Sequence, residues 1–105
     1  MKLRAGQRLM ALREAMGIIR EDFSSLTGIE VRRLENIEYC RARMAEDEFE
    51  SICSQMPEVA LWLTFGGDIS LEALKASEAK HSRLIAAKFE NELLPPDSPL
   101  IDKIK

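Results

Sequence analysis

The sequence TGIEVRRLENIE, residues 27–38, combines a glycine near its start with two apolar residues three positions apart. Gly28 can adopt a positive φ at little steric cost, so the chain can turn sharply between a helix that ends before it and a helix that follows. The spacing of Leu34 and Ile37 predicts one buried face on the second helix. The stretch also carries three glutamates against two arginines, so net charge alone does not assign its outward face.

The apolar residues elsewhere also recur at helical spacing, and no alternating run of strand length occurs, which predicts an all-α fold. The first four helices are expected at about 4–16, 20–26, 30–39 and 46–56. Pro57 can open a fifth helical segment, PEVALWLTFGG, because proline fits the first turn of a helix. A further helix is expected from Ser70, as its N-cap, to about residue 93. The segment LIDKIK, residues 100–105, is predicted to be a loosely held tail.

Size and composition are those of an ordinary globular protein. The 105 residues suffice for one modest core, and 46% of them are apolar against 31% charged. No apolar run approaches the ~18 residues that cross a bilayer, and no secretory signal is visible, so we expect a cytoplasmic protein without membrane contact. Cys40 and Cys53 lack metal-ligand spacing; free thiols are expected, with a redox-sensing pair as the alternative.

Charge is distributed unevenly along the chain. Residues 1–43 hold nine Lys/Arg against six Asp/Glu, a balance of +3, whereas residues 44–105 hold six against twelve, a balance of −6. This asymmetry indicates an amino-terminal half that faces a polyanion and a carboxy-terminal half with another role.

Enzymatic chemistry finds little support in the sequence. The single histidine, His81, lies on an expected helix without a cysteine or a paired acid at nucleophile or metal spacing. Gly66 and Gly67 are better explained as a helix stop than as a phosphate-binding loop. We therefore expect no catalytic residue, no metal site and no cofactor.

The order of these features resembles the phage-repressor-like (Cro/Xre) helix-turn-helix family over residues 3–67. LMALREAMG is similar to the family's first helix, REDFSSLTGIEVRRLENIE fills its helix-turn-helix frame, and WLTFGG is similar to the ending after its fifth helix. Arg20, Glu30 and Cys40 depart from the residues that the family prefers there, so no known operator is carried over. The resemblance implies a five-helix lambda-repressor-like DNA-binding domain over 1–67, with an additional C-terminal helix and tail over 68–105.

The resemblance also implies which side chains read DNA, because the second helix of such a motif enters the major groove. Arginine can bond guanine through two atoms, asparagine can pair with adenine, and valine can pack on a thymine methyl. Arg20 is expected to touch phosphate or base, and Arg41 and Arg43 in the following loop are expected to touch phosphate. The residues expected at the bases are Val31, Arg32, Arg33 and Asn36.

The glutamates of this stretch are assigned by position. Glu38 corresponds to the family acid that pairs with an arginine of the first helix, here Arg13, and we expect a partly buried ion pair. Glu30 suits the positive end of the helix dipole or accepts a hydrogen bond from cytosine. Glu35 faces solvent or orients Arg32 from three residues away.

The implied function is a sequence-specific transcriptional regulator, a repressor, that binds a palindromic operator in double-stranded DNA as a homodimer. The fifth helical segment is apolar nearly all round, which predicts a dimer surface there and on the 70–93 helix. The alternative is that the 70–93 helix covers its own domain and forms no contact with a second copy. The residues assigned to the dimer are Leu61, Trp62, Phe65, Leu74, Ile85 and Phe89. A different class, a protein-interaction module such as an antitoxin or anti-regulator, would use the acidic second half to bind a basic partner.

Overall fold

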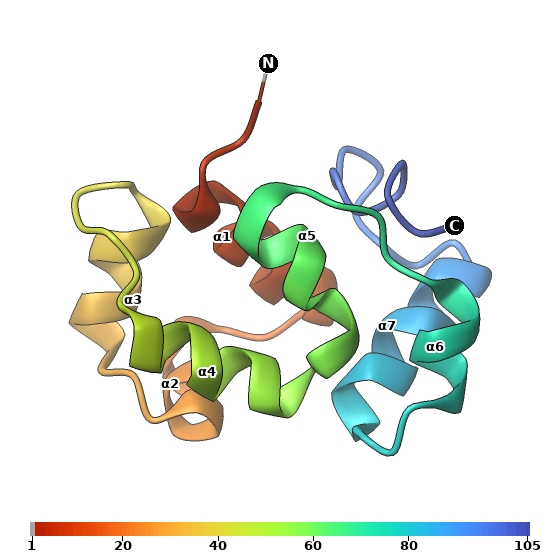
Figure 1. The fold of residues 1–105 in the computed structure, drawn as a ribbon, viewed down its shortest axis with the longest axis horizontal. Coiled ribbons are helices and arrows are strands. Elements are labelled where there is room, and N and C mark those ends of the chain that lie inside the picture. Colours follow the sequence, from red (N-terminus) through yellow and green to blue (C-terminus); the bar gives the residue numbers. More distant parts are fainter. Residues whose placement is uncertain (1) are drawn as a thin grey trace.

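The computed structural model describes residues 2–105, and all of their regular elements are helices (Figure 1). The helices are α1 (Ala5–Met16), α2 (Arg20–Thr27), α3 (Val31–Glu38), α4 (Glu46–Gln55), α5 (Ala60–Phe65), α6 (Leu71–Ala76) and α7 (Lys80–Glu90), with a 3₁₀ turn at Pro57–Val59. α1 packs against α3, α5 and α7, so it connects the two ends of the molecule. In Figure 1, α2 and α3 lie at one end and α6 and α7 at the other.

The first four helices begin and end within one residue of their expected positions, because local signals set their ends. The Gln7 side chain accepts the backbone N–H of Arg4 at 2.8 Å, and Glu48 accepts that of Ala45 at 2.8 Å, which satisfies one free donor at the start of α1 and of α4. α2 ends at Gly28, which has a φ of 77°. Only glycine reaches such an angle without a steric penalty, and the predicted turn before α3 follows from it.

One hydrophobic cluster includes side chains from α1 through to the end of the chain. Residues 68–105 therefore share a core with residues 2–67. The largest side chains with almost no exposure are Leu9, Leu12, Phe23, Leu34, Ile37, Ile52, Met56, Trp62, Leu63, Ile69, Leu74 and Ile85. Full burial of one such side chain contributes roughly 1.5–3 kcal/mol to stability, so this shared core holds both segments together.

A buried arginine fastens α5 to α1. Arg8 donates from Nε to the Leu63 carbonyl at 2.9 Å and from Nη2 to the Thr64 carbonyl at 3.1 Å. These carbonyls belong to the last turn of α5, where the carbonyl oxygens have no N–H donor within the helix itself. Burial lowers the pKa of Arg8. Arg8 was not among the residues predicted to be structural, although an arginine within an apolar helix face is a signal for such a role.

The prediction of a single helix over residues 70–93 is wrong. The structure has two helices there, α6 and α7, separated by residues 77–79. Ser77 and Ala79 are both extended, and the Ser77 hydroxyl accepts the N–H of Ala79 at 3.0 Å. The break turns α7 back onto α6, so that Leu74 and Ile85 both reach the core with no exposed surface.

The prediction of a loosely held tail at residues 100–105 is also wrong, because this segment is held against the core. Leu100 is fully buried and Ile104 is 5% exposed. The backbone of Ile69 donates to Lys103 and accepts from Lys105, both at 2.8 Å, which forms an isolated parallel bridge with Ile104. Two apolar side chains four positions apart give this short segment enough buried surface to hold it against the core.

α1 and α3 cross at a glycine that the sequence analysis did not assign. A Cβ atom built on Gly6 would lie 2.0 Å from the carbonyl oxygen of Ile37 and 3.0 Å from its carbonyl carbon. Both atoms belong to the backbone of α3, so they cannot move aside as a flexible side chain would. Gly6 therefore sets the distance between the central helix and α3.

Gly6→Ala is expected to lower the free energy of unfolding by about 3 kcal/mol, because the new methyl group forces the two helix backbones apart. An alanine in an unobstructed helix would instead stabilise by about 1 kcal/mol relative to glycine. Gly28→Ala is the comparison. Its Cβ would meet no atom within 4 Å, so the free energy of unfolding should fall only by the cost of a left-handed φ for alanine, about 1 kcal/mol. Urea unfolding measures both variants, and a Gly6→Ala protein as stable as the wild type would exclude the close crossing.

Candidate nucleic-acid interface

The helix pair α2–α3 is fixed on α1 by apolar and polar contacts. Leu34 and Ile37 of α3 and Phe23 of α2 have no exposed surface. The turn between the helices is held by Thr27, whose hydroxyl donates to the Phe23 carbonyl at 2.8 Å and accepts the Ile29 N–H at 3.3 Å. The opposite face of α3 is left without a covering element at this end of the molecule (Figure 1).

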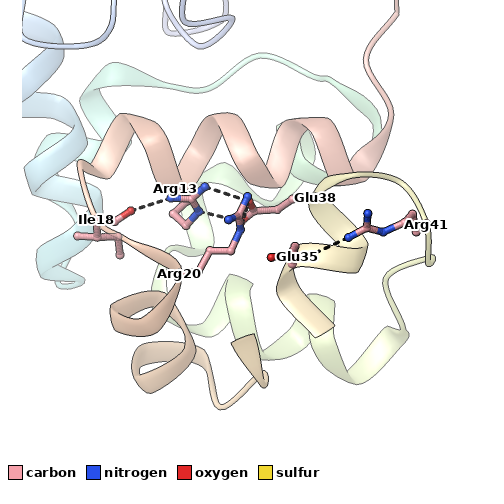
Figure 2. A network of polar contacts seen from close by, with 6 residues as sticks. All are labelled: Arg13, Ile18, Arg20, Glu35, Glu38 and Arg41. Atoms are coloured by element: carbon pink, nitrogen blue, oxygen red, sulfur yellow. Dashed lines mark hydrogen bonds and ion pairs between the residues drawn. The ribbon is translucent and has the colours of Figure 1, made fainter. Parts of the chain in front are cut away.

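Glu38 is the centre of a buried ion network (Figure 2). Arg13 binds it through two atoms, with Nε at 2.8 Å from Oε2 and Nη2 at 3.0 Å from Oε1. Arg20 adds a third bond, from Nε to Oε1 at 3.0 Å, and the Glu38 side chain has no exposed surface. The ion pair expected between Arg13 and Glu38 is therefore present, and α2 is included in it. Arg13 also donates to the Ile18 carbonyl at 2.9 Å, which holds the loop between α1 and α2.

Arg33 points toward α4, away from the outward face expected of it. Its Nε and Nη2 each lie 2.8 Å from a carboxylate oxygen of Glu48, and Nη2 also donates to the Arg43 carbonyl at 2.7 Å. The hydrogen bond from Arg33 outweighs burial and lowers the pKa of the Glu48 carboxyl. In this conformation Arg33 joins α3 to α4, which corrects the expectation that it lies at the bases. No local pattern predicts this pair, because its members are 15 positions apart in the chain.

Arg32 is exposed on the outward face of α3, where the sequence analysis placed it. Asn36 and Glu35 are partly exposed beside it, and both bind Arg41: its Nε lies 3.1 Å from Asn36 Oδ1 and its Nη2 3.2 Å from Glu35 Oε1. Glu35 therefore has Arg41 as its partner, and not Arg32 (Figure 2). The structure brings Arg32, Asn36 and Arg41 onto one surface.

The remaining predicted DNA contacts lie around the ends of α3. Val31 is partly buried in its first turn, and Glu30 is exposed at its N-cap position without a side-chain capping bond. Arg43 is exposed in the loop that follows α3. Arg20 lies at the start of α2, and 21% of its side chain stays exposed beside its bond to Glu38.

Tyr39 is a residue of this surface that the sequence analysis missed. It follows α3 directly, and 52% of it is exposed. The guanidinium carbons of Arg20 and Arg41 lie over its ring, 5.2 and 5.3 Å from the ring centre. An aromatic residue directly after NIE and two positions before an arginine was the available signal.

The residues assigned to a dimer surface divide into two groups. The structure buries three of them in the core of this chain: Trp62, Leu74 and Ile85. They have no surface to offer a second copy, which corrects the expectation, and α6 and α7 cover their own domain instead. Phe89 is partly buried against the core. Leu61 and Phe65 are 59% and 58% exposed and lie one turn apart on α5.

The histidine, the cysteines and the acids of the described residues form no further cluster with metal-ligand geometry. Residues 2–105 contain no group of three or more His, Cys, Asp or Glu side chains placed to hold a metal ion. His81 lies on α7, far along the chain from α3, and its pKa is lowered by burial and by the charge of Lys80. Cys40 and Cys53 are free thiols, and burial raises the pKa of Cys53. No helix in the described part of the chain combines the length and apolar character that a bilayer crossing requires.

Comparisons of the chain with family models, with curated proteins and with solved structures found no match.

Glu38→Gln is expected to lower the free energy of unfolding by about 3 kcal/mol, because it leaves two largely buried guanidiniums without their shared carboxylate. Glu35→Gln is the matched control. Its pair with Arg41 is about half exposed, so the loss should stay below about 1 kcal/mol. Urea unfolding measures the free energy of unfolding of both variants. Equal decreases would mean that the buried network does not hold the three helices together.

Proposed function

We propose that this protein binds double-stranded DNA in a sequence-specific manner, with α3 in the major groove, and regulates transcription as a repressor. The observation that carries the proposal is the α2–Gly28–α3 pair, whose apolar side is buried while Arg32 stands exposed on the opposite side. A short helix presented in this way fits the width of the major groove. The resemblance of residues 20–38 to the Cro/Xre helix-turn-helix frame supports the same conclusion.

Arg32 is the residue assigned to a guanine, because its guanidinium is exposed at the amino-terminal part of α3 and forms no ion pair with another side chain of residues 2–105. Asn36 lies one turn further along and can turn its amide to an adenine when Arg41 moves to a phosphate. Val31 is assigned to a thymine methyl. Glu30, at the N-cap position, is assigned to a cytosine amino group. Arg33 keeps its structural pair with Glu48 in this proposal.

Arg32→Ala is expected to weaken binding to a DNA sequence selected by the wild type by about tenfold or more, since a bidentate guanine contact contributes roughly 1–3 kcal/mol. Lys80→Ala is the control, because it removes one exposed positive charge at the other end of the molecule and should change affinity less than twofold. Arg33→Ala separates the two arginines: it should lower stability through Glu48 and leave the preferred bases unchanged. The measurement is selection from random DNA followed by titration at fixed salt.

Failure of the wild type to enrich any motif at moderate salt would contradict the proposal. It would favour the second candidate, an interaction module that binds a basic partner through the acidic residues 44–105. The specific observation behind that candidate is the balance of −6 in this segment, together with the exposed Leu61 and Phe65.

We further propose that the protein binds a palindromic operator as a homodimer, with Leu61 and Phe65 of α5 at the subunit contact. A monomer with one short reading helix covers too few base pairs for genomic specificity. Both side chains project from one face of α5 and are nearly 60% exposed, so together they form an apolar patch that a second copy could cover.

Leu61→Asp with Phe65→Asp is expected to convert a dimer of twice 11.9 kDa into a monomer in light scattering, because two charges would then be desolvated at the contact. Leu93→Asp, which changes another exposed apolar residue far from α5 in sequence, should leave the mass unchanged. A wild type that stays monomeric at every concentration, with and without DNA, would refute the homodimer.

A further inference from the structure

Tyr39 occupies an unusual position for the only tyrosine of the chain. Its neighbours Ile37 and Glu38 are buried, whereas more than half of Tyr39 is exposed directly after the last turn of α3. The ring is not required by the hydrophobic cluster, which does not include it. The interaction of its oxygen with the Arg20 guanidinium, which raises the pKa of Arg20 although burial opposes it, leaves the O–H hydrogen to be donated to a group outside the protein.

Two arginines from different parts of the chain meet at this ring. Arg20 comes from the start of α2 and Arg41 from the loop after α3, and both guanidinium carbons lie within 5.3 Å of the ring centre. A guanidinium within about 6 Å of an aromatic face is attracted by the negative charge of that face. Each arginine is also oriented by a second group: Arg20 by Glu38, and Arg41 by Asn36. Arg20 is thus held in place before any ligand arrives, which lowers the entropy cost of binding, whereas Arg41 exchanges its exposed bond to Asn36 for the ligand.

The local charge is positive around Tyr39. Three arginines, Arg13, Arg20 and Arg41, share two carboxylates, those of Glu38 and Glu35. Arg13 already binds Glu38 through two atoms, so Arg20 has only a share of that charge. The Arg41–Glu35 pair is exposed on both sides and is weak for that reason. One positive charge remains in excess, and an anion bound to both guanidiniums would offset their mutual repulsion.

We propose that Arg20, Tyr39 and Arg41 form one site for a phosphodiester group of the DNA backbone. The Tyr39 hydroxyl donates a hydrogen bond to one non-bridging oxygen, and the two guanidiniums donate to the phosphate oxygens, as arginine does in charge-assisted contacts. The inference rests on the proposed function, because it assigns the anion to DNA. The place of the site supports this choice: it lies at the carboxyl end of α3, and an end of a helix seated in the major groove lies next to the backbone.

Tyr39→Phe tests the hydroxyl without removing the ring that holds the two arginines. Affinity is expected to fall about tenfold, the effect of one hydrogen bond to a charged group, and by the same factor for a selected duplex and for a random duplex. Arg41→Ala should weaken both duplexes as well and should reduce the slope of log affinity against log salt by about 1, because one phosphate contact is lost. Thermal unfolding of Tyr39→Phe should match that of the wild type. Leu93→Ala is the control and should change neither affinity nor slope.

Because Tyr39 is the only tyrosine, its ring resonances in an NMR spectrum report on this site alone. They are expected to shift when a 20-base-pair duplex is added to the wild type, and to shift less with Arg41→Ala. A wild type that selects a DNA motif, combined with a Tyr39→Phe protein of unchanged affinity, would overturn the site and leave the proposed function intact. Resonances that respond to inorganic phosphate and not to duplex DNA would overturn the assignment to the DNA backbone. A wild type that binds no duplex at any salt would overturn the proposed function, and this inference with it.

Discussion

A carboxylate with no exposed surface, Glu38, accepts hydrogen bonds from Arg13 of α1 and Arg20 of α2. Burial of a single charge is costly unless it is paired and hydrogen-bonded, so this residue fixes three helices at one point. Gly6 acts beside it, because only a residue without a side chain lets α1 approach the Ile37 carbonyl so closely. The outward face of α3 has its orientation because these two contacts and the buried Leu34 and Ile37 leave no freedom to rotate.

The same network explains why the arginines of the interface are not equivalent. Arg13 and Arg33 are both engaged by carboxylates through two hydrogen bonds, so each holds helices together. Arg20 shares the Glu38 carboxylate with Arg13, and Arg41 pairs with an exposed acid, Glu35. Their incompletely neutralised guanidiniums both lie over the ring of Tyr39. Arg32 and Arg43 stand outside the ion pairs described for residues 2–105. The net negative charge of residues 27–38 therefore does not prevent this end of the molecule from exposing arginines, since two of the three glutamates bind arginines of other elements.

The carboxy-terminal segment contributes to the core of the whole chain. The break at residues 77–79 lets α6 and α7 fold against each other, and Lys88 of α7 donates to the Met16 carbonyl at 3.3 Å, at the end of α1. Trp62, Leu74 and Ile85 are used inside the chain for this purpose. What remains for a partner on α5 is the pair Leu61 and Phe65, a smaller surface than the apolar composition of that segment indicated.

The sequence by itself determined the all-helical class, the ends of the first four helices and the turn at Gly28, because apolar spacing and capping residues act over a few positions. The Arg13–Glu38 pair followed from the resemblance to a known frame. The tertiary structure alone decided that Arg33 binds Glu48, that Cys40 adopts a φ of 60° after α3, that the last helical segment breaks, and that Tyr39 meets Arg20 and Arg41. Each of these depends on how elements distant in the chain pack together. A local pattern carries the preference of a residue for burial or exposure, but the partner that satisfies a charge is set by the path of the whole backbone.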